Sequence, residues 1–144
     1  MTRVIVDANV ACMVFQRPTD SKWNDLHEAL LYGRRFVIVA VHGGTLTREY
    51  EKISKLKRVF VQLDRAGRLH AFPHKSVDGE TSTVSSSGIC RSNDSHIIAL
   101  ALISRARVLC TDDPALMTDF KNKRLISSPR GSVYRGSKNN HLLR

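Results

Sequence analysis

The stretch Ser92–Phe120, with the sequence SNDSHIIALALISRARVLCTDDPALMTDF, decides the fold. Apolar residues fall three, four and seven positions after Asp94, which is the spacing of one helix face. The pattern therefore predicts a helix from about Asn93, capped by Ser92 or Asn93. It also places Asp94 on the face that should be buried, near the positive end of the helix dipole.

A short strand is expected directly after this helix. Arg107–Thr111 is apolar and β-branched, and the chain then turns at Asp112, Asp113 and Pro114. An acid on a buried helix face and an acid pair at a strand end are costly unless something neutralises them. A divalent cation would do so.

The chain outside this stretch predicts a strand–helix alternation. We expect strands at Arg3–Asp7, Arg35–Val41, Leu69–Pro73 and Arg124–Ser127, and helices at Ser21–Leu31, from Thr45 to about Lys57, and Ala115–Lys121, with Val59–Gly67 as a helical extension. The polar segment His74–Arg91 is expected to be a long mobile loop. Such alternation is typical of an α/β protein, a three-layer α/β/α sandwich with a mostly parallel central sheet.

Length and composition indicate one globular domain. The chain has 144 residues, of which 42% are hydrophobic and 25% charged. No apolar run approaches the roughly 18 residues of a membrane span, and the start has no cleavage site of a signal peptide. Three scattered cysteines, Cys12, Cys90 and Cys110, show neither disulfide nor zinc spacing, so we expect reduced thiols in a cytoplasmic protein. The expected domain is residues 1–127, followed by a tail or loose extension, 128–144.

The net charge of +10 favours a polyanionic partner, most simply nucleic acid. The segment after Asp119 contains basic residues and no acid. The candidate nucleic-acid-binding residues there are Lys121, Lys123, Arg124, Arg130 and Arg135. The alternative is a basic tail that only solubilises the protein.

Two further acids occupy positions where function concentrates. Asp7 ends the first strand, and the carboxyl ends of parallel strands are where ligands gather in α/β sheets. Glu49 lies inside an apolar helical stripe with Leu46 and Tyr50. The alternatives are a turn or cap role for Asp7 and a surface pair of Glu49 with Arg48 or Lys52.

Four acidic positions from separate elements are expected to converge: Asp7, Glu49, Asp94 and the pair Asp112–Asp113. They would repel one another unless cations bind or some are protonated. Oxygen ligands favour Mg²⁺ or Mn²⁺. Such a site in a basic surface suits hydrolysis of a phosphodiester bond.

The ordered motifs resemble those of the PIN-domain family. These are DAN at Asp7–Asn9, TREYEKI around Glu49, and NDSHIIALAL followed by RVLCTDD and LMTDF, spread over residues 3 to about 127. The resemblance implies a PIN-type sandwich and a metal-dependent endoribonuclease that cuts single-stranded RNA. It implies metal ligands at Asp7, Glu49, Asp94 and Asp113, with orienting roles for Asn9 and Thr111.

The sequence departs from the family pattern after Thr111. Two acids, Asp112 and Asp113, precede Pro114, and Asp119 comes later. By the T-x-D spacing we favour Asp113 as the ligand, with Asp112 as the alternative and Asp119 as a cap or supporting acid.

Small bacterial members of the family resemble toxins of toxin–antitoxin pairs, which implies an antitoxin partner and a homodimer. Two other functions fit the same residues: a non-catalytic nucleic-acid-binding module and a metal-dependent DNA nuclease.

Overall fold

A five-stranded sheet in the order β3-β2-β1-β4-β5 forms the middle of the molecule. The computed structural model describes residues 1–16 and 20–144. The strands are β1 (Thr2–Val6), β2 (Phe36–His42), β3 (Leu69–Pro73), β4 (Val108–Cys110) and β5 (Ser132–Tyr134). All four neighbouring pairs are parallel, and Val4 lies opposite Ile38 on one side and Val108 on the other. The expected α/β class with a parallel sheet is confirmed.

The central strands are buried on both faces, which explains why they appear in the sequence as continuous apolar runs. Ile5 and Val6 are fully buried although consecutive side chains of a strand point to opposite faces. Parallel sheets show this pattern because helices cover both sides.

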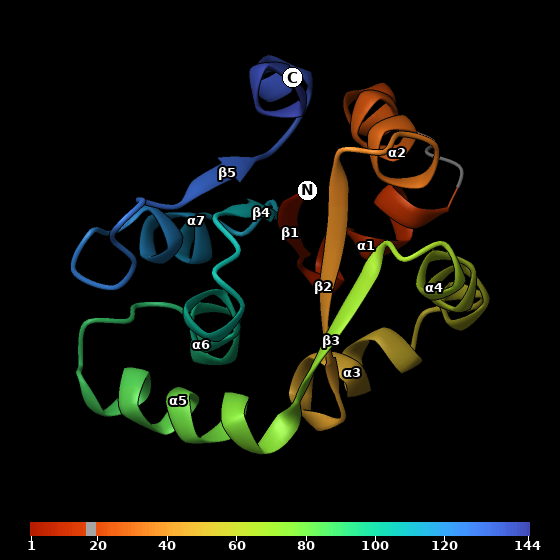
Figure 1. Cartoon of the computed structure of the whole chain (residues 1–144). Helices are drawn as coiled ribbons and strands as arrows, with labels where there is room; N and C mark the ends of the chain where they lie inside the picture. The colour runs from red at the N-terminus through yellow and green to blue at the C-terminus, as the bar shows by residue number, and fades with distance from the viewer. Residues whose placement is uncertain (17–19) are drawn as a thin grey trace.

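Helices cover both faces of the sheet (Figure 1). They are α1 (Ala8–Phe15), α2 (Asn24–Leu31), α3 (Gly44–Glu51), α4 (Leu56–Arg65), α5 (His74–Ser86), α6 (Ser95–Ser104) and α7 (Pro114–Lys121), with 3₁₀ turns η1 (Ser21–Trp23) and η2 (Ser137–Leu143). The chain builds outward from β1 to β3, and then from β4 to β5 on the other side. Right-handed crossovers in opposite directions place α1–α4 on one face and α5–α7 on the other. The expected three-layer sandwich is therefore confirmed.

The expected loop at His74–Arg91 is wrong, because its first part is the helix α5. Val77 and Val84 are seven residues apart, two helical turns, and both are buried. The hydroxyl of Thr81 donates to the carbonyl oxygen of Val77 at 2.7 Å, and Ser82 and Thr83 bond to carbonyls four residues back in the same way. Packing along α6 (Figure 1) stabilises a helix whose sequence is mostly polar.

The expected helix from Thr45 to Lys57 is wrong in both bounds. Its cap is Gly43 and α3 begins at Gly44; both residues have positive φ, 87° and 83°, which glycine adopts without strain. It ends at Glu51, and Lys55 with φ of 67° separates it from α4. The expected extension at Val59–Gly67 is therefore part of an independent helix.

The expected strand at Arg124–Ser127 is also wrong. Asn122 folds this segment into a turn: its carbonyl oxygen accepts from the amides of Leu125 and Ile126 at 2.9 and 3.0 Å. The last strand is β5, which pairs with β4. Ser132–Tyr134 thus belongs to the sheet and is not a loose extension; the domain boundary after residue 127 stays a prediction. Across the described ranges, no helix has the length and apolar character needed to cross a membrane.

Candidate metal centre

The carboxyl ends of β1 and β4 bring Asp7 and Thr111 together. Val6 is in register with Cys110, and the amide of Asp7 donates to the carbonyl oxygen of Cys110 at 2.9 Å. One residue further, the Thr111 hydroxyl donates to Oδ2 of Asp7 at 2.8 Å. These two strands lie where the chain changes direction in the sheet, the usual ligand position in such folds. Thr111 therefore orients Asp7 directly.

Asp7 is an acid in an unfavourable environment. Its side chain is 5% exposed. The pKa of Asp7 is raised to about 6. Burial is the largest cause and the negative charges of Asp94 and Glu49 add to it, whereas the hydrogen bond from Thr111 opposes it. The structure thus brings Asp7, Glu49 and Asp94 within electrostatic reach of one another.

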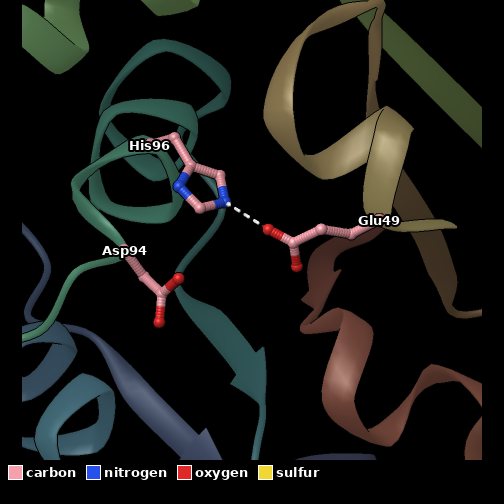
Figure 2. A group of neighbouring side chains, drawn as sticks. All are labelled: Glu49, Asp94 and His96. Atoms are coloured by element: carbon pink, nitrogen blue, oxygen red, sulfur yellow. Dashed lines mark ion pairs between the residues drawn. The ribbon is translucent and has the colours of Figure 1, made fainter.

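Glu49, Asp94 and His96 form a group of potential metal ligands (Figure 2). One ligand atom from each lies within 4.8 Å of the others. Glu49 of α3 and His96 of α6 point toward one another, with 3.8 Å between Oε1 and Nε2. This group can hold a metal ion.

His96 favours ligation in its neutral form. Burial lowers the pKa of its imidazole, although the charges of Asp94 and Glu49 raise it. A neutral imidazole has a free nitrogen lone pair, which a metal ion requires. Sequence analysis assigned no role to His96. The signal was its position two residues after Asp94, but only the packing of α3 against α6 shows that it faces Glu49.

Asp94 is itself the residue that precedes α6, so neither Ser92 nor Asn93 occupies the cap position. The hydroxyl of Ser92 instead accepts from the amide of Asp94 at 3.3 Å. Burial raises the pKa of Asp94; the charge of His96 lowers it, and those of Asp113 and Asp119 raise it. Asp113 therefore lies near Asp94.

Asp112 and Asp113 point to different places. Asp113 caps α7, where its Oδ1 accepts from the amide of Ala115 at 3.0 Å. Asp112 is exposed, and its Oδ1 accepts from the side-chain amide of Asn9 at 2.8 Å. Of the pair, Asp113 is the one that influences the pKa of Asp94. This position supports the preference for Asp113 as a ligand, which stays a prediction.

Asp119 is fully buried and anchors the segment that leads to Asp94. Its carboxylate accepts from the amides of Arg91 and Ser92, at 2.9 and 2.8 Å, and from the Cys90 thiol at 3.2 Å. Burial alone would raise its pKa, but these hydrogen bonds lower it below the ordinary value. Asp119 therefore supports the chain next to Asp94. Asp94 and the acids near it, Asp7, Glu49 and Asp113, are called the acid group below.

The basic residues expected to bind nucleic acid separate into two places. All five are exposed: Lys121, Lys123, Arg124, Arg130 and Arg135. Lys121 ends α7, which runs back about 12 Å from the acids. Arg130 donates to the carbonyl oxygen of Lys121 at 2.6 Å, at the amino end of the sheet. Arg135 alone among the five follows the carboxyl end of β5, on the side of the acids.

Comparisons with known proteins give one structural likeness. No family model matches the chain, and no curated protein matches it. VapBC2 from Rickettsia felis, solved bound to a DNA fragment from their promoter, is similar in structure with a TM-score of 0.49 and 15% identity. The likeness covers 93% of this chain and 100% of that chain. What this chain does must therefore be inferred from its own residues.

Proposed function

We propose that this protein is a Mg²⁺- or Mn²⁺-dependent endoribonuclease that hydrolyses phosphodiester bonds of single-stranded RNA. The observation that carries the proposal is the convergence of Asp7, Glu49 and Asp94 from three separate elements, with His96 beside Glu49 and Asp94. The resemblance of the motifs to the PIN family supports the choice of RNA, and the net charge of +10 supports a nucleic-acid substrate.

The donor set fits a hard divalent cation. Within residues 1–16 and 20–144, no Lys or Arg forms an ion pair with these acids. Buried acids without a cationic partner are costly, so a bound cation would stabilise them. Carboxylate oxygens suit Mg²⁺ and Mn²⁺, and His96 adds one nitrogen donor that suits transition metals better.

In the proposed mechanism the chain holds the cation through Asp7, Glu49, Asp94 and Asp113. Bound there, the cation would supply Lewis-acid chemistry, which activates a water and neutralises charge on the leaving oxygen. Thr111 fixes the orientation of Asp7 by its hydrogen bond. Asn9 holds Asp112 at the rim of the site, and nearby basic residues hold the phosphates that flank the cut.

The resemblance also supports the biological setting that we propose. The protein would be the toxin of a toxin–antitoxin pair, a cytoplasmic homodimer restrained by its antitoxin.

The test is cleavage of a labelled single-stranded RNA pool in Mn²⁺, Mg²⁺ or EDTA. Asp94→Asn should lower the rate by on the order of a hundredfold or more, and it should weaken Mn²⁺ binding measured by calorimetry. Asp64→Asn, the same change at an exposed acid of α4, should leave both unchanged.

Three outcomes would contradict the proposal. Equal cleavage by wild type and Asp94→Asn would point to a contaminating nuclease. Cleavage of a matched DNA oligonucleotide but not of RNA would indicate a DNA nuclease. Salt-sensitive binding without cleavage, unaffected by metal, would indicate a binding module.

A further inference from the structure

A basic pocket lies beside the acid group, at the point where the chain leaves β5. The cavity has a volume of about 420 Å³ and is lined by Lys22, Asp112, Met117 and Arg135–Lys138. We propose that this pocket binds a backbone phosphate of nucleic acid. The position of that phosphate next to the one that is cut rests on the proposed function.

Sheet topology places the pocket next to the acids. Cys110 of β4 is in register with Tyr134 of β5, so the residues that follow both strands emerge at the same edge. Asp112 and Asp113 follow β4, and Arg135 follows β5. Asp113 lies near Asp94. A strand of nucleic acid that crosses the acid group therefore passes this pocket.

One wall of the pocket comes from η1, which contributes Lys22. Lys22 packs against the backbone of Gly136, where an added Cβ would lie 3.5 Å from the Cβ of Lys22. The ammonium group of Lys22 lies 5.3 Å from the centre of the Trp23 ring, and this attraction restricts the side chain. Segments more than a hundred residues apart thus contribute cations to one cavity.

The pocket carries uncompensated positive charge. Lys22, Arg135 and Lys138 provide three cations, and none forms an ion pair within the described part of the chain. Asp112 is the acid among the lining residues, and its Oδ1 is occupied by the Asn9 amide. Three cations against one carboxylate favour an anion, and a phosphate is the anion that nucleic acid offers.

Hydrogen bonds hold the basic segment in place before any ligand binds. The amide of Arg135 donates to Oδ1 of Asn139 at 3.1 Å, and the hydroxyl of Tyr134 donates to Oδ1 of Asn140 at 2.6 Å. Asn140 in turn donates to Asp25 of α2 at 2.6 Å. A preformed site loses less entropy when the ligand binds, so these cations are better placed than those of a flexible tail.

The experiment compares two variants with the same loss of charge, both made in Asp94→Asn protein so that RNA stays intact. The pocket variant carries Lys22→Gln, Arg135→Gln and Lys138→Gln. The control carries Lys57→Gln, Arg58→Gln and Arg65→Gln, which change exposed residues of α4. Binding of a labelled single-stranded RNA is measured by fluorescence anisotropy over a series of KCl concentrations.

We expect the pocket variant to bind more than tenfold more weakly than its parent. The slope of log K against log salt should fall by about 0.7, because the pocket holds one phosphate and each lost phosphate contact on a single strand contributes about 0.7. The control should lose less than threefold. Arg135→Gln alone should weaken binding in the same direction but by a smaller factor, which guards against a folding defect in the triple variant. Equal losses in both triple variants would overturn the inference.

A second arm assigns the effect to phosphate. Neutral methylphosphonate linkages along the RNA should abolish the difference between parent and pocket variant, and a persisting difference would overturn the inference. If the wild-type protein binds RNA through the pocket but never cleaves it, the proposed function is wrong and the phosphate site stands. Unchanged binding in the Asp94→Asn protein, together with unchanged cleavage when the same three substitutions are made in wild type, would do the reverse.

Discussion

Asp7 is a carboxyl group whose charged form is disfavoured by its surroundings. It is buried, its neighbours are acids, and one hydroxyl hydrogen-bonds its carboxylate. Without a bound cation the folded protein binds a proton at Asp7 more tightly than the unfolded chain does, because burial raises the pKa to about 6 from 3.8. The stabilisation that Asp7 gives is therefore complete below about pH 4 and is lost as the pH rises through 6.

Replacing Asp7 by Asn should therefore stabilise the metal-free protein at pH 7. Asn keeps an oxygen for the Thr111 hydroxyl but has no charge to bury. Because one pKa unit corresponds to about 1.4 kcal/mol, we expect a gain on the order of 3 kcal/mol at pH 7 and much less at pH 4. Urea unfolding in EDTA at both pH values measures it.

Asp64→Asn, at an exposed acid, serves as the control and should show no such dependence on pH. If Asp7→Asn stabilises the protein equally at pH 4 and pH 7, or destabilises it at pH 7, then burial does not disfavour the charged form of Asp7.

The sequence predicted the acids of the site better than it predicted their surroundings. Asp7 and Asp94 were visible because each lies at the end of an apolar run or on an apolar helix face. His96 was not recognisable from the sequence, because an isolated histidine near a helix start has no distinctive pattern. Its partner Glu49 lies 47 positions earlier, and only the contact between α3 and α6 pairs them.

Helix α5 shows how tertiary packing overrides a polar sequence. Its residues favour turns, since Ser and Thr compete for backbone hydrogen bonds. The structure uses those hydroxyls within the helix instead, and buries Val77 and Val84. Two valines among polar residues gave too little periodicity to predict a helix.

The glycine inside α5 gives a direct test of that helix. Gly79 lies mid-helix, and an added Cβ would meet nothing within 4 Å. Gly79→Ala should therefore stabilise the protein by about 0.5–1 kcal/mol, because Ala loses less backbone entropy in a helix. Thermal unfolding would detect the gain as a higher Tm.

The matched control is Gly67→Ala, which also has open space but sits at φ of 70°. That conformation strains any residue with a Cβ, so this variant should lower the Tm. No change at Gly79 would argue that residues 74–86 do not form a stable helix.

The sequence predicted strands at the positions of β1 to β4 but missed β5. β1 and β2 were predicted because buried parallel strands are rich in Val and Ile. β5 has three residues, Ser132–Tyr134, and such a short edge strand gives almost no pattern. The nearby apolar pair Leu125–Ile126 was the stronger signal, but Asn122 turns it away from the sheet.

At the scale of the whole molecule, the last strand, β5, is part of the core. Tyr134 of β5 is fully buried, and the centre of its ring lies 6.2 Å from that of Trp23, the residue that precedes α2. The segment after β5 thereby joins the last strand to a helix near the start of the chain.

Tyr134→Ala should accordingly destabilise the protein by about 3–5 kcal/mol, the usual cost of removing a buried aromatic side chain. Tyr32→Ala makes the same chemical change at a side chain that is 72% exposed, and should cost less than about 0.5 kcal/mol. Urea unfolding of both variants measures the difference. Similar losses in the two variants would argue that residues after 131 are not integral to the fold.

The position of β1 between β2 and β4 has a consequence for synthesis of the protein. Asp7 is made more than a hundred residues before Thr111, which follows β4 and donates its hydroxyl hydrogen bond to Asp7. The strand that completes the basic pocket follows later still. A nascent chain that stops short of β4 lacks Thr111 and Asp113, so the proposed metal site can assemble only after β4 and the residues that follow it have been made.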